Sequence, residues 1–298
     1  MINYQIETTY AAAGVDIDAG NKAVELMKAH IAKTNRKEVI GSLGGFAGMF
    51  DISAAKKMSH PTLATSTDGV GTKTEIARKL NRFDGIGEDL VAMVVDDLVV
   101  CGAEPLFMTD YIAVGKVFPE RIAEIVSGIA RGCEKAGTAL IGGETAEHPG
   151  LLKEDEFDIA GAATGAVDEE NLLGEHRIKE GDLLLAMPSS GIHANGFSLV
   201  RHILESKKLK LDESFEDSTL GEVLLKPTEI YTLDCLVLQK ALKENLHGFS
   251  HITGGGLQAN TDRVIPENLE AKYDWSLWEI PAVMKYLAEV GSVPRSDL

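Results

Sequence analysis

The sequence predicts an α/β protein with two parts, and three observations support this prediction. Segments typical of strands alternate with segments typical of helices along the chain. The order strand, glycine-rich turn, helix occurs once in each half. The length of 298 residues corresponds to two domains at roughly 150 residues each. We therefore expect an N-terminal domain at residues 1–168 and a C-terminal α/β domain at residues 169–298.

In the first half, each expected element has its own signal. Residues 62–67 favour a strand, and a glycine-punctuated turn follows at 68–73. Residues 87–101 are apolar around nearly the whole helical circumference, which predicts a buried helix. Pro119 begins an amphipathic helix. Strands are expected at 107–114, 138–141 and 157–167.

The second half is predicted to repeat this plan after an acidic, helix-prone link at 168–180. An apolar run at 182–187 predicts a buried strand, a polar loop follows, and 197–205 predicts a helix. A strand at 247–253 leads into three glycines and a helix that begins near Leu257. Further helices are expected from Pro281 to Gly291 and at 228–242, the latter with a buried face made of Ile230, Leu233, Val237 and Ala241.

Charge and composition exclude several classes of protein. Lys plus Arg number 29 and Asp plus Glu 46, which gives a net charge of −17. Such acidity argues against nucleic acid or an anionic membrane as the partner. The sequence shows no N-terminal signal segment and no run of 18 apolar residues, so we expect a soluble, cytoplasmic protein. Cys101, Cys133 and Cys235 are expected to be reduced core residues.

Two adjacent acids, Asp96 and Asp97, interrupt the apolar helix. Buried carboxylates are costly unless they are paired, protonated or bound to a cation, and Mg²⁺ prefers a few carboxylates with water and phosphate. Asp97 is the stronger metal candidate because it shares a helical face with Leu90 and Val94. The alternative is that both acids lie at a helix edge, solvated or paired with a lysine.

Glycine-rich turns provide candidate anion sites. In the turn at 68–73, the backbone of Gly69, Gly71 and Thr72 could surround a phosphate that Lys73 neutralises, while Asp68 reaches a metal. Such turns also merely connect strands. The stretch 41–48, with Gly44, Gly45 and Gly48, could be a flap over an anion or a plain linker. Glu144 follows the end of a predicted strand. It is either a second metal ligand or a catalytic base, or it is an acid that caps a helix.

Two loops of the second half combine polar side chains with glycines. Ser190, His193 and Asn195 lie between a predicted strand and helix, which is typical of a polar ligand site, although Asn195 could simply cap the helix. His251 and Thr253 precede Gly254 and Gly255 in a turn suited to a phosphate. Without further information, the residues indicate a magnesium-nucleotide enzyme of unspecified substrate.

Seven strings together resemble the phosphoribosylformylglycinamidine cyclo-ligase family, also called aminoimidazole ribonucleotide synthetases. They occur in family order over essentially the whole chain, and their combination is highly specific: AGVDIDAGN, GSLGGFAG, TDGVGTK, DDLVVCGAEPLF, IGGETAEHPG, SSGIHANGFSLVR and HITGGG. The resemblance implies an enzyme of purine biosynthesis. It would use ATP to close the ring of formylglycinamidine ribonucleotide, releasing aminoimidazole ribonucleotide, ADP and phosphate.

The resemblance also implies an assembly and roles for the candidate residues. The N-terminal halves of a homodimer would share a barrel, and ATP would bind there. By this resemblance, magnesium-ATP would be held by Asp68, Asp97 and Glu144, with Lys73 near a phosphate and a flap over the nucleotide made of Gly44, Gly45 and Gly48. The substrate side would be lined by Ser190, His193, Asn195, His251 and Thr253. Either His251 or His193 would transfer a proton.

The chain departs from the family pattern at two places. The pair Asp96-Asp97 is more often Asn-Asp, which favours Asp97 as the essential member. Family members continue beyond the position of Leu298 with a YRTFN-type segment, so the second domain is expected to be incomplete. Alternative functions are those of thiamine-monophosphate kinases, selenophosphate synthetases or an inactive nucleotide-binding dimer.

Overall fold

A four-stranded sheet forms the centre of the first half. The computed structural model describes residues 14–41 and 44–294. In spatial order the strands are β3 (Pro61–Gly69), β6 (Phe157–Asp168), β4 (Glu104–Val114) and β5 (Ala139–Glu147). β4 and β5 are parallel, and the other neighbours are antiparallel. The strands predicted in this half are confirmed, although β5 extends beyond 138–141.

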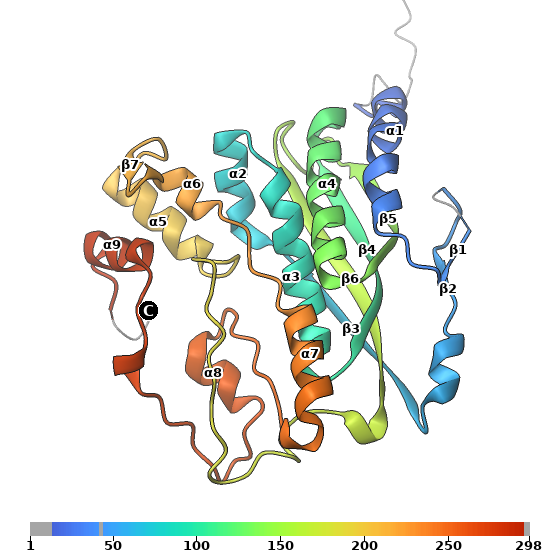
Figure 1. The fold of residues 1–298 in the computed structure, drawn as a ribbon. Coiled ribbons are helices and arrows are strands. Elements are labelled where there is room, and N and C mark those ends of the chain that lie inside the picture. Colours follow the sequence, from blue (N-terminus) through green and yellow to red (C-terminus); the bar gives the residue numbers. More distant parts are fainter. Residues whose placement is uncertain (1–13, 42–43, 295–298) are drawn as a thin grey trace, which may run out of the picture.

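Helices cover one face of this sheet (Figure 1). The predicted apolar helix is α3 (Asp84–Val100), and it packs against the sheet and against α4 (Pro119–Ala136). Pro119 lies in the first turn of α4, and Gly137 ends that helix at φ 68°. The other helices here are α1 (Ile17–Lys33), which packs on α4, and α2 (Thr74–Leu80).

The backbones of α3 and α4 approach each other at glycines. A Cβ at Gly128 would lie 1.9 Å from the carbonyl oxygen of Asp84, and one at Gly87 would lie 2.2 Å from the backbone nitrogen of Ile129. This proximity explains why these positions lack side chains. Buried Ile, Leu and Val residues fill the remaining space between the helices and the sheet.

The second half lies on the α3 side of the first half (yellow to red in Figure 1). Its helices are α5 (Phe197–Lys207), α6 (Leu220–Leu224), α7 (Thr232–Leu242), α8 (Gly256–Asp262) and α9 (Ala282–Gly291). Short antiparallel pairs join β1 (Val39–Ile40) with β2 (Met49–Phe50), and β7 (Ser214–Phe215) with β8 (Ser218–Thr219). Single 3₁₀ turns occur at Ser53–Lys57, Gly71–Lys73, Glu169–Asn171, Lys243–Asn245 and Trp275–Leu277.

Both strands predicted for the second half are absent from the described residues. The segment 182–187 forms no strand, and Leu183 and Leu185 are 89% and 90% exposed. The segment 247–253 also forms no strand. A strand requires a hydrogen-bonded neighbour, and no described strand pairs with either segment. An apolar run alone therefore did not determine the structure.

Three smaller predictions were also wrong. α7 begins at Thr232 rather than at 228, and Leu233 and Val237 are exposed while Cys235 is buried. The link at 168–180 contains only the 3₁₀ turn Glu169–Asn171, because its polar residues have no apolar face to bury. Cys101 is exposed, because it lies just past the end of α3.

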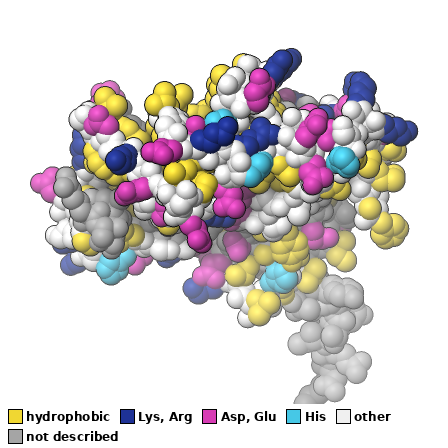
Figure 2. Space-filling model, turned by 90° about the horizontal axis from the view of Figure 1, so that it is seen from below, with side chains coloured by type: hydrophobic (Ala, Val, Ile, Leu, Met, Phe, Trp, Pro, Cys, Tyr) yellow, Lys and Arg dark blue, Asp and Glu magenta, His cyan; other side chains and the backbone are white. Residues whose placement is uncertain are grey.

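Surface charges are mixed on the face seen from below, where acidic and basic side chains alternate with apolar ones (Figure 2). Among the described residues, no helix is long and apolar enough to cross a membrane.

Candidate functional site

Asp97 lies where the sheet, α3 and the second half meet. Its Oδ2 accepts a hydrogen bond from Ser66 Oγ of β3 at 3.1 Å. Its Oδ1 lies 2.8 Å from Nδ1 of His251. Burial by itself raises the pKa of Asp97, but the contacts with His251 and Ser66 outweigh it and hold the pKa below its usual range. The Asp97 side chain is 42% exposed, so a ligand can reach this carboxylate.

Asp68 belongs to the same side of the sheet. It follows Ser66 by two residues in β3, and residues two apart in a strand point to the same face. Asp68 is exposed, and its Oδ1 accepts a hydrogen bond from the backbone of Gly69 at 2.7 Å. The strand thus directs Asp68 and Ser66 toward the helix that carries Asp97.

These two carboxylates suit a hard cation such as Mg²⁺, which commonly binds one or two carboxylates together with water and phosphate oxygens. Oxygens of both side chains are accessible. In the part of the chain that the structure describes, no three His, Cys, Asp or Glu residues cluster as a complete metal site. The donor set therefore fits a cation that arrives with a phosphate ligand.

Asp96 has a different environment from Asp97. It is buried, and it accepts hydrogen bonds from the backbone nitrogen of Tyr231 at 3.1 Å and from Thr232 Oγ1 at 2.7 Å. Burial raises the pKa of Asp96 to about 6. Asp96 therefore fixes the beginning of α7 and does not face a ligand. This arrangement also excludes the solvated-edge interpretation for Asp96.

The two polar loops of the second half meet above α3. Asn195 Nδ2 lies 3.5 Å from Sδ of Met93 in α3. A Cβ at Gly254 would lie 3.3 Å from Asn195 Oδ1, so the loop that contains His251 and Thr253 lies against the loop that contains Asn195. Gly254 and Gly255 are exposed. Asp97, His251 and Asn195, predicted from separate motifs, are thus brought together along α3.

His193 is held in a neutral state. Its Nε2 accepts a hydrogen bond from the backbone of Ser190 at 3.0 Å. Burial, followed by the charge of Lys73, lowers the pKa of His193 to about 4. Ser190 Oγ donates to the carbonyl of Pro227 at 2.7 Å. His193 and Ser190 therefore shape the loop, and the ring is a weak base.

Lys73 differs from the prediction of a phosphate-neutralising lysine. It is completely buried, and its Nζ donates to Asp89 Oδ1 at 2.8 Å, to the carbonyl of His193 at 2.7 Å and to that of Lys226 at 2.8 Å. All three ammonium donors are thereby used. The neighbouring Thr72 shares a hydrogen bond of 3.2 Å with Ser198 at the start of α5, and Gly71 adopts φ 69°.

Glu144 lies on the opposite face of the sheet from Asp68. One cross-strand row points toward the helices and consists of Asp68, Gly161, Asp110 and Gly143. Glu144 follows this row in β5, and consecutive residues of a strand alternate faces. Within one chain, Glu144 therefore does not lie beside Asp68, and its role in metal binding stays a prediction. β5 continues through Glu144 because β4 pairs with it as far as Glu147.

The glycine flap is also distant from Asp68 of the same chain. A Cβ at Gly48 would lie 2.6 Å from the carbonyl oxygen of Ile141 in β5. β5 and β3 are opposite edges of the sheet, three strand spacings or about 14 Å apart. Gly44 and Gly45 are exposed, and residues 42–43 of this stretch lie outside the described residues.

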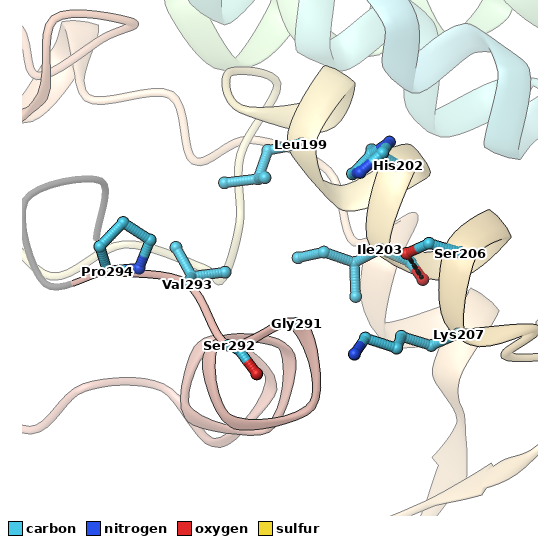
Figure 3. A pocket seen from close by; sticks show the side chains of 9 residues that line it. All are labelled: Leu199, His202, Ile203, Ser206, Lys207, Gly291, Ser292, Val293 and Pro294. Atoms are coloured by element: carbon cyan, nitrogen blue, oxygen red, sulfur yellow. Dashed lines mark hydrogen bonds between the residues drawn. The ribbon is translucent and has the colours of Figure 1, made fainter.

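A surface cavity of about 370 Å³ lies elsewhere, between α5 and the end of α9 (Figure 3). Leu199 and Ile203 point into it, with His202 and Lys207 at its side. None of the predicted site residues lines this cavity. The candidate site is therefore the junction at Asp97 and not this cavity.

Sequence reasoning missed Ser66, Asp89, Thr228 and Tyr231, which hold the site residues in place. Of these four residues, Asp89 had a sequence signal that could have identified it, because it is a further acid in a mostly apolar helix.

Comparison with known families matches residues 48–167 to the N-terminal domain of AIR synthase related proteins and residues 179–290 to their C-terminal domain. A phosphoribosylformylglycinamidine cyclo-ligase of Desulfitobacterium hafniense is 51% identical over 290 residues, which cover 97% of this chain and 85% of the relative. The same enzyme of Alkaliphilus oremlandii is 48% identical over 296 residues, 98% of this chain and 86% of the relative.

Solved structures of lower identity share the fold. Thiamine-monophosphate kinase from Stenotrophomonas maltophilia has a TM-score of 0.59 at 18% identity, covering 93% of this chain and 79% of its own. HypE from E. coli has a TM-score of 0.59 at 17% identity, and the match covers 92% of this chain and 78% of the HypE chain. The predicted two-part α/β architecture is confirmed by these matches together with the two family domains.

Proposed function

Because the chain belongs to the phosphoribosylformylglycinamidine cyclo-ligase family, we propose that it closes the ring of formylglycinamidine ribonucleotide at the expense of ATP. The observation that carries this proposal is the junction at Asp97. There an accessible carboxylate touches both Ser66 of the sheet and His251 of the second half. A nucleotide held by the first half and a substrate held by the second would meet at this point.

The reaction has two steps. The formyl amide oxygen of the substrate attacks the γ-phosphorus of ATP, a P–O bond forms, and ADP leaves. An amidine nitrogen then attacks the activated formyl carbon, the C–O bond breaks, and phosphate leaves as the nitrogen loses a proton. The products are aminoimidazole ribonucleotide, ADP and phosphate. Phosphorylation is needed because an unmodified amide oxygen is a poor leaving group.

Asp68 and Asp97 are the residues that would hold Mg²⁺ with the phosphates of ATP. The ion would supply charge neutralisation during phosphoryl transfer. The backbone of Gly69, Gly71 and Thr72 lies beside Asp68 at the end of β3 and would contribute to nucleotide binding. Glu144 is left out of this metal site, since it points to the other face of the sheet.

His251 is the better candidate for proton transfer. Its Nδ1 faces Asp97, which orients the ring and leaves Nε2 to accept a proton from the amidine nitrogen. His193 is less suited, because its Nε2 already accepts a hydrogen bond and its pKa is about 4. Ser190, Asn195 and Thr253, with the backbone of Gly254 and Gly255, would line the ribonucleotide side.

A homodimer is proposed to form through the sheet face that the helices leave open. Leu63 of the edge strand β3 and Tyr111 of the inner strand β4 are 64% and 41% exposed on this face, and exposed side chains of this size are typical of an interaction surface. A second copy packed on this face would cover them. Gly48 lies at the β5 edge, where a neighbouring copy could bring it and the other flap glycines, Gly44 and Gly45, close to a nucleotide.

Release of ADP with and without formylglycinamidine ribonucleotide tests the function. We expect release that depends on this substrate, together with an equal amount of aminoimidazole ribonucleotide. Release stimulated only by thiamine monophosphate or by selenide would contradict the proposal. Nucleotide binding without turnover of any of the three substrates would indicate an inactive dimer.

A further inference from the structure

α3 presents two buried acids to the second half of the chain. Asp89 and Asp96 are seven residues apart, which is two helical turns, so they lie on one face. Both accept hydrogen bonds from residues 226–232, which we call the anchor segment. Asp89 Oδ1 accepts from the backbone nitrogen and Oγ1 of Thr228 at 2.8 and 2.6 Å. Asp96 accepts from Tyr231 and Thr232.

The anchor segment in turn holds the loop 188–196. The carbonyl of Pro227 accepts from Ser190 Oγ at 2.7 Å, and the Tyr231 hydroxyl donates to the carbonyl of Pro188 at 2.9 Å. The loop therefore has two side-chain contacts with a segment that is itself bound to α3 at two points.

Lys73 connects all three parts. Its fully buried ammonium donates to Asp89 of α3, to the carbonyl of Lys226 in the anchor segment and to the carbonyl of His193 in the loop. A buried ammonium is costly unless it is paired and hydrogen-bonded, and here all its donors are satisfied. The directions of these three bonds fix the loop backbone relative to α3.

We propose that Lys73 and Asp89 are positioning residues that set the place of the ribonucleotide-binding loop relative to Asp97. Since Asp97 is on the same helix, α3 determines the distance between the phosphate-binding acids and the loop. This inference rests on the proposed function. It assigns to Lys73 a role toward the ribonucleotide through the loop backbone and no contact with ATP.

A purely stabilising role predicts a different pattern of defects. Loss of stability alone would lower the amount of folded enzyme without changing one Michaelis constant selectively. Misplacement of the loop would raise the KM for formylglycinamidine ribonucleotide and leave the KM for ATP nearly unchanged. It would also speed hydrogen exchange at the Ser190 amide, which donates to His193 Nε2 within the loop.

The sharpest variants are Thr228→Val and Thr228→Ser. Valine has nearly the shape of threonine but cannot donate to Asp89, whereas serine keeps the hydroxyl. A second test is the double variant Lys73→Met with Asp89→Asn, which removes the buried charges together and leaves neither unpaired. Lys135→Met is the matched control, because Lys135 belongs to α4 and pairs with Glu88, the neighbour of Asp89, and not with the loop.

For Thr228→Val we expect at least a threefold rise in the ribonucleotide KM, and for the double variant at least a tenfold rise. The KM for ATP should change less than twofold in both. Thr228→Ser and Lys135→Met should resemble the wild type. Amide hydrogen exchange at residues 189–195 should be at least tenfold faster in the double variant. If the double variant does not fold, amide hydrogen exchange at residues 189–195 is measured in Thr228→Val instead. We expect it to be at least twofold faster than in the wild type.

Unchanged exchange at 189–195, or equal rises in both KM values, would overturn the positioning role. If the wild-type protein forms no aminoimidazole ribonucleotide, the proposed function fails instead. The exchange measurement still decides whether Lys73 and Asp89 hold the loop, because it requires no turnover.

Discussion

At the scale of single residues, the site depends on the different environments of two adjacent acids. Asp96 is buried and bound to the start of α7, while Asp97 is accessible and faces Ser66 and His251. One step along a helix turns a side chain by about 100°, so neighbours face different surroundings. Asp96 thus supports the fold of the second half, and the accessible Asp97 is the acid that we propose to bind the ligand.

Replacing Asp97 by Asn tests the importance of its charge. The amide keeps the size of the side chain and can still accept from Ser66, but it cannot neutralise a cation. We expect kcat/KM for ring closure to fall about 100-fold or more in a variant that still folds and unfolds cooperatively. Asp217→Asn, in the exposed turn between β7 and β8, is the control. Activity within threefold of the wild type would refute the assignment of Asp97.

The buried ring of His193 predicts a dependence of stability on pH. Its pKa is lowered from 6.5 to about 4, so between these values the unfolded chain binds more protons than the folded protein. The contribution of the neutral ring is complete above pH 6.5 and is lost as the pH falls toward 4. From pH 7 to 5 the wild type should lose about 1–2 kcal/mol more unfolding free energy than His193→Gln. Equal losses in urea titrations of the two proteins would contradict this.

The sequence indicates Asp97 as a candidate site residue because a charged residue in an apolar helix has few physical explanations. Sequence reasoning misassigned Lys73, since a lysine after a glycine turn suits a phosphate equally well. What decides the role of Lys73 is Asp89, 16 residues away, together with two backbone carbonyls of the second half. No local pattern encodes these distant contacts.

At the scale of elements, the close packing of α3 on α4 determines where the acids of α3 lie. The two helices meet at Gly87 and Gly128, where a Cβ would overlap the opposite backbone. The helix backbones can approach only because these side chains are missing, and α3 then lies between the sheet and the second half.

Two glycine-to-alanine variants test this packing. Gly128→Ala should lower the unfolding free energy by about 2–4 kcal/mol, because its Cβ would lie 1.9 Å from the Asp84 carbonyl oxygen. Gly20→Ala in α1 meets no atom within 4 Å and should raise the unfolding free energy by about 0.5–1 kcal/mol. Chemical denaturation measures both. Similar effects of the two substitutions would contradict the packing described here.

Of the first-half helices, α3 and α4 were predicted because their signals are local: an apolar circumference for α3, and Pro119 at the start of α4. The helices α1 and α2 were not predicted. The strands predicted at 182–187 and 247–253 failed for the opposite reason. A strand exists only with a neighbour, and an apolar run does not specify one. The division between residues 168 and 169 stays a prediction.

At the scale of the whole molecule, the sheet has helices on one face and exposed side chains on the other. Half-covered sheets usually bury their apolar face, so exposed Leu63 and Tyr111 are evidence for a partner surface. The proposed partner is a second copy of the chain.

Leu63→Glu tests this proposal. A carboxylate in the middle of the proposed interface would have to be buried without a partner, so we expect the variant to sediment as a monomer at concentrations where the wild type is a dimer. Leu277→Glu, at a residue of the second half that is 78% exposed, should stay dimeric. A wild-type protein that sediments as a monomer would contradict the dimer.

The central claim is that this molecule activates a formyl amide oxygen with ATP and then closes a ring. Substrate labelled with ¹⁸O in the formyl group tests it directly, by mass spectrometry of the released phosphate. We expect one ¹⁸O atom in phosphate for each aminoimidazole ribonucleotide formed. Unlabelled phosphate, released while the ring closes, would contradict it.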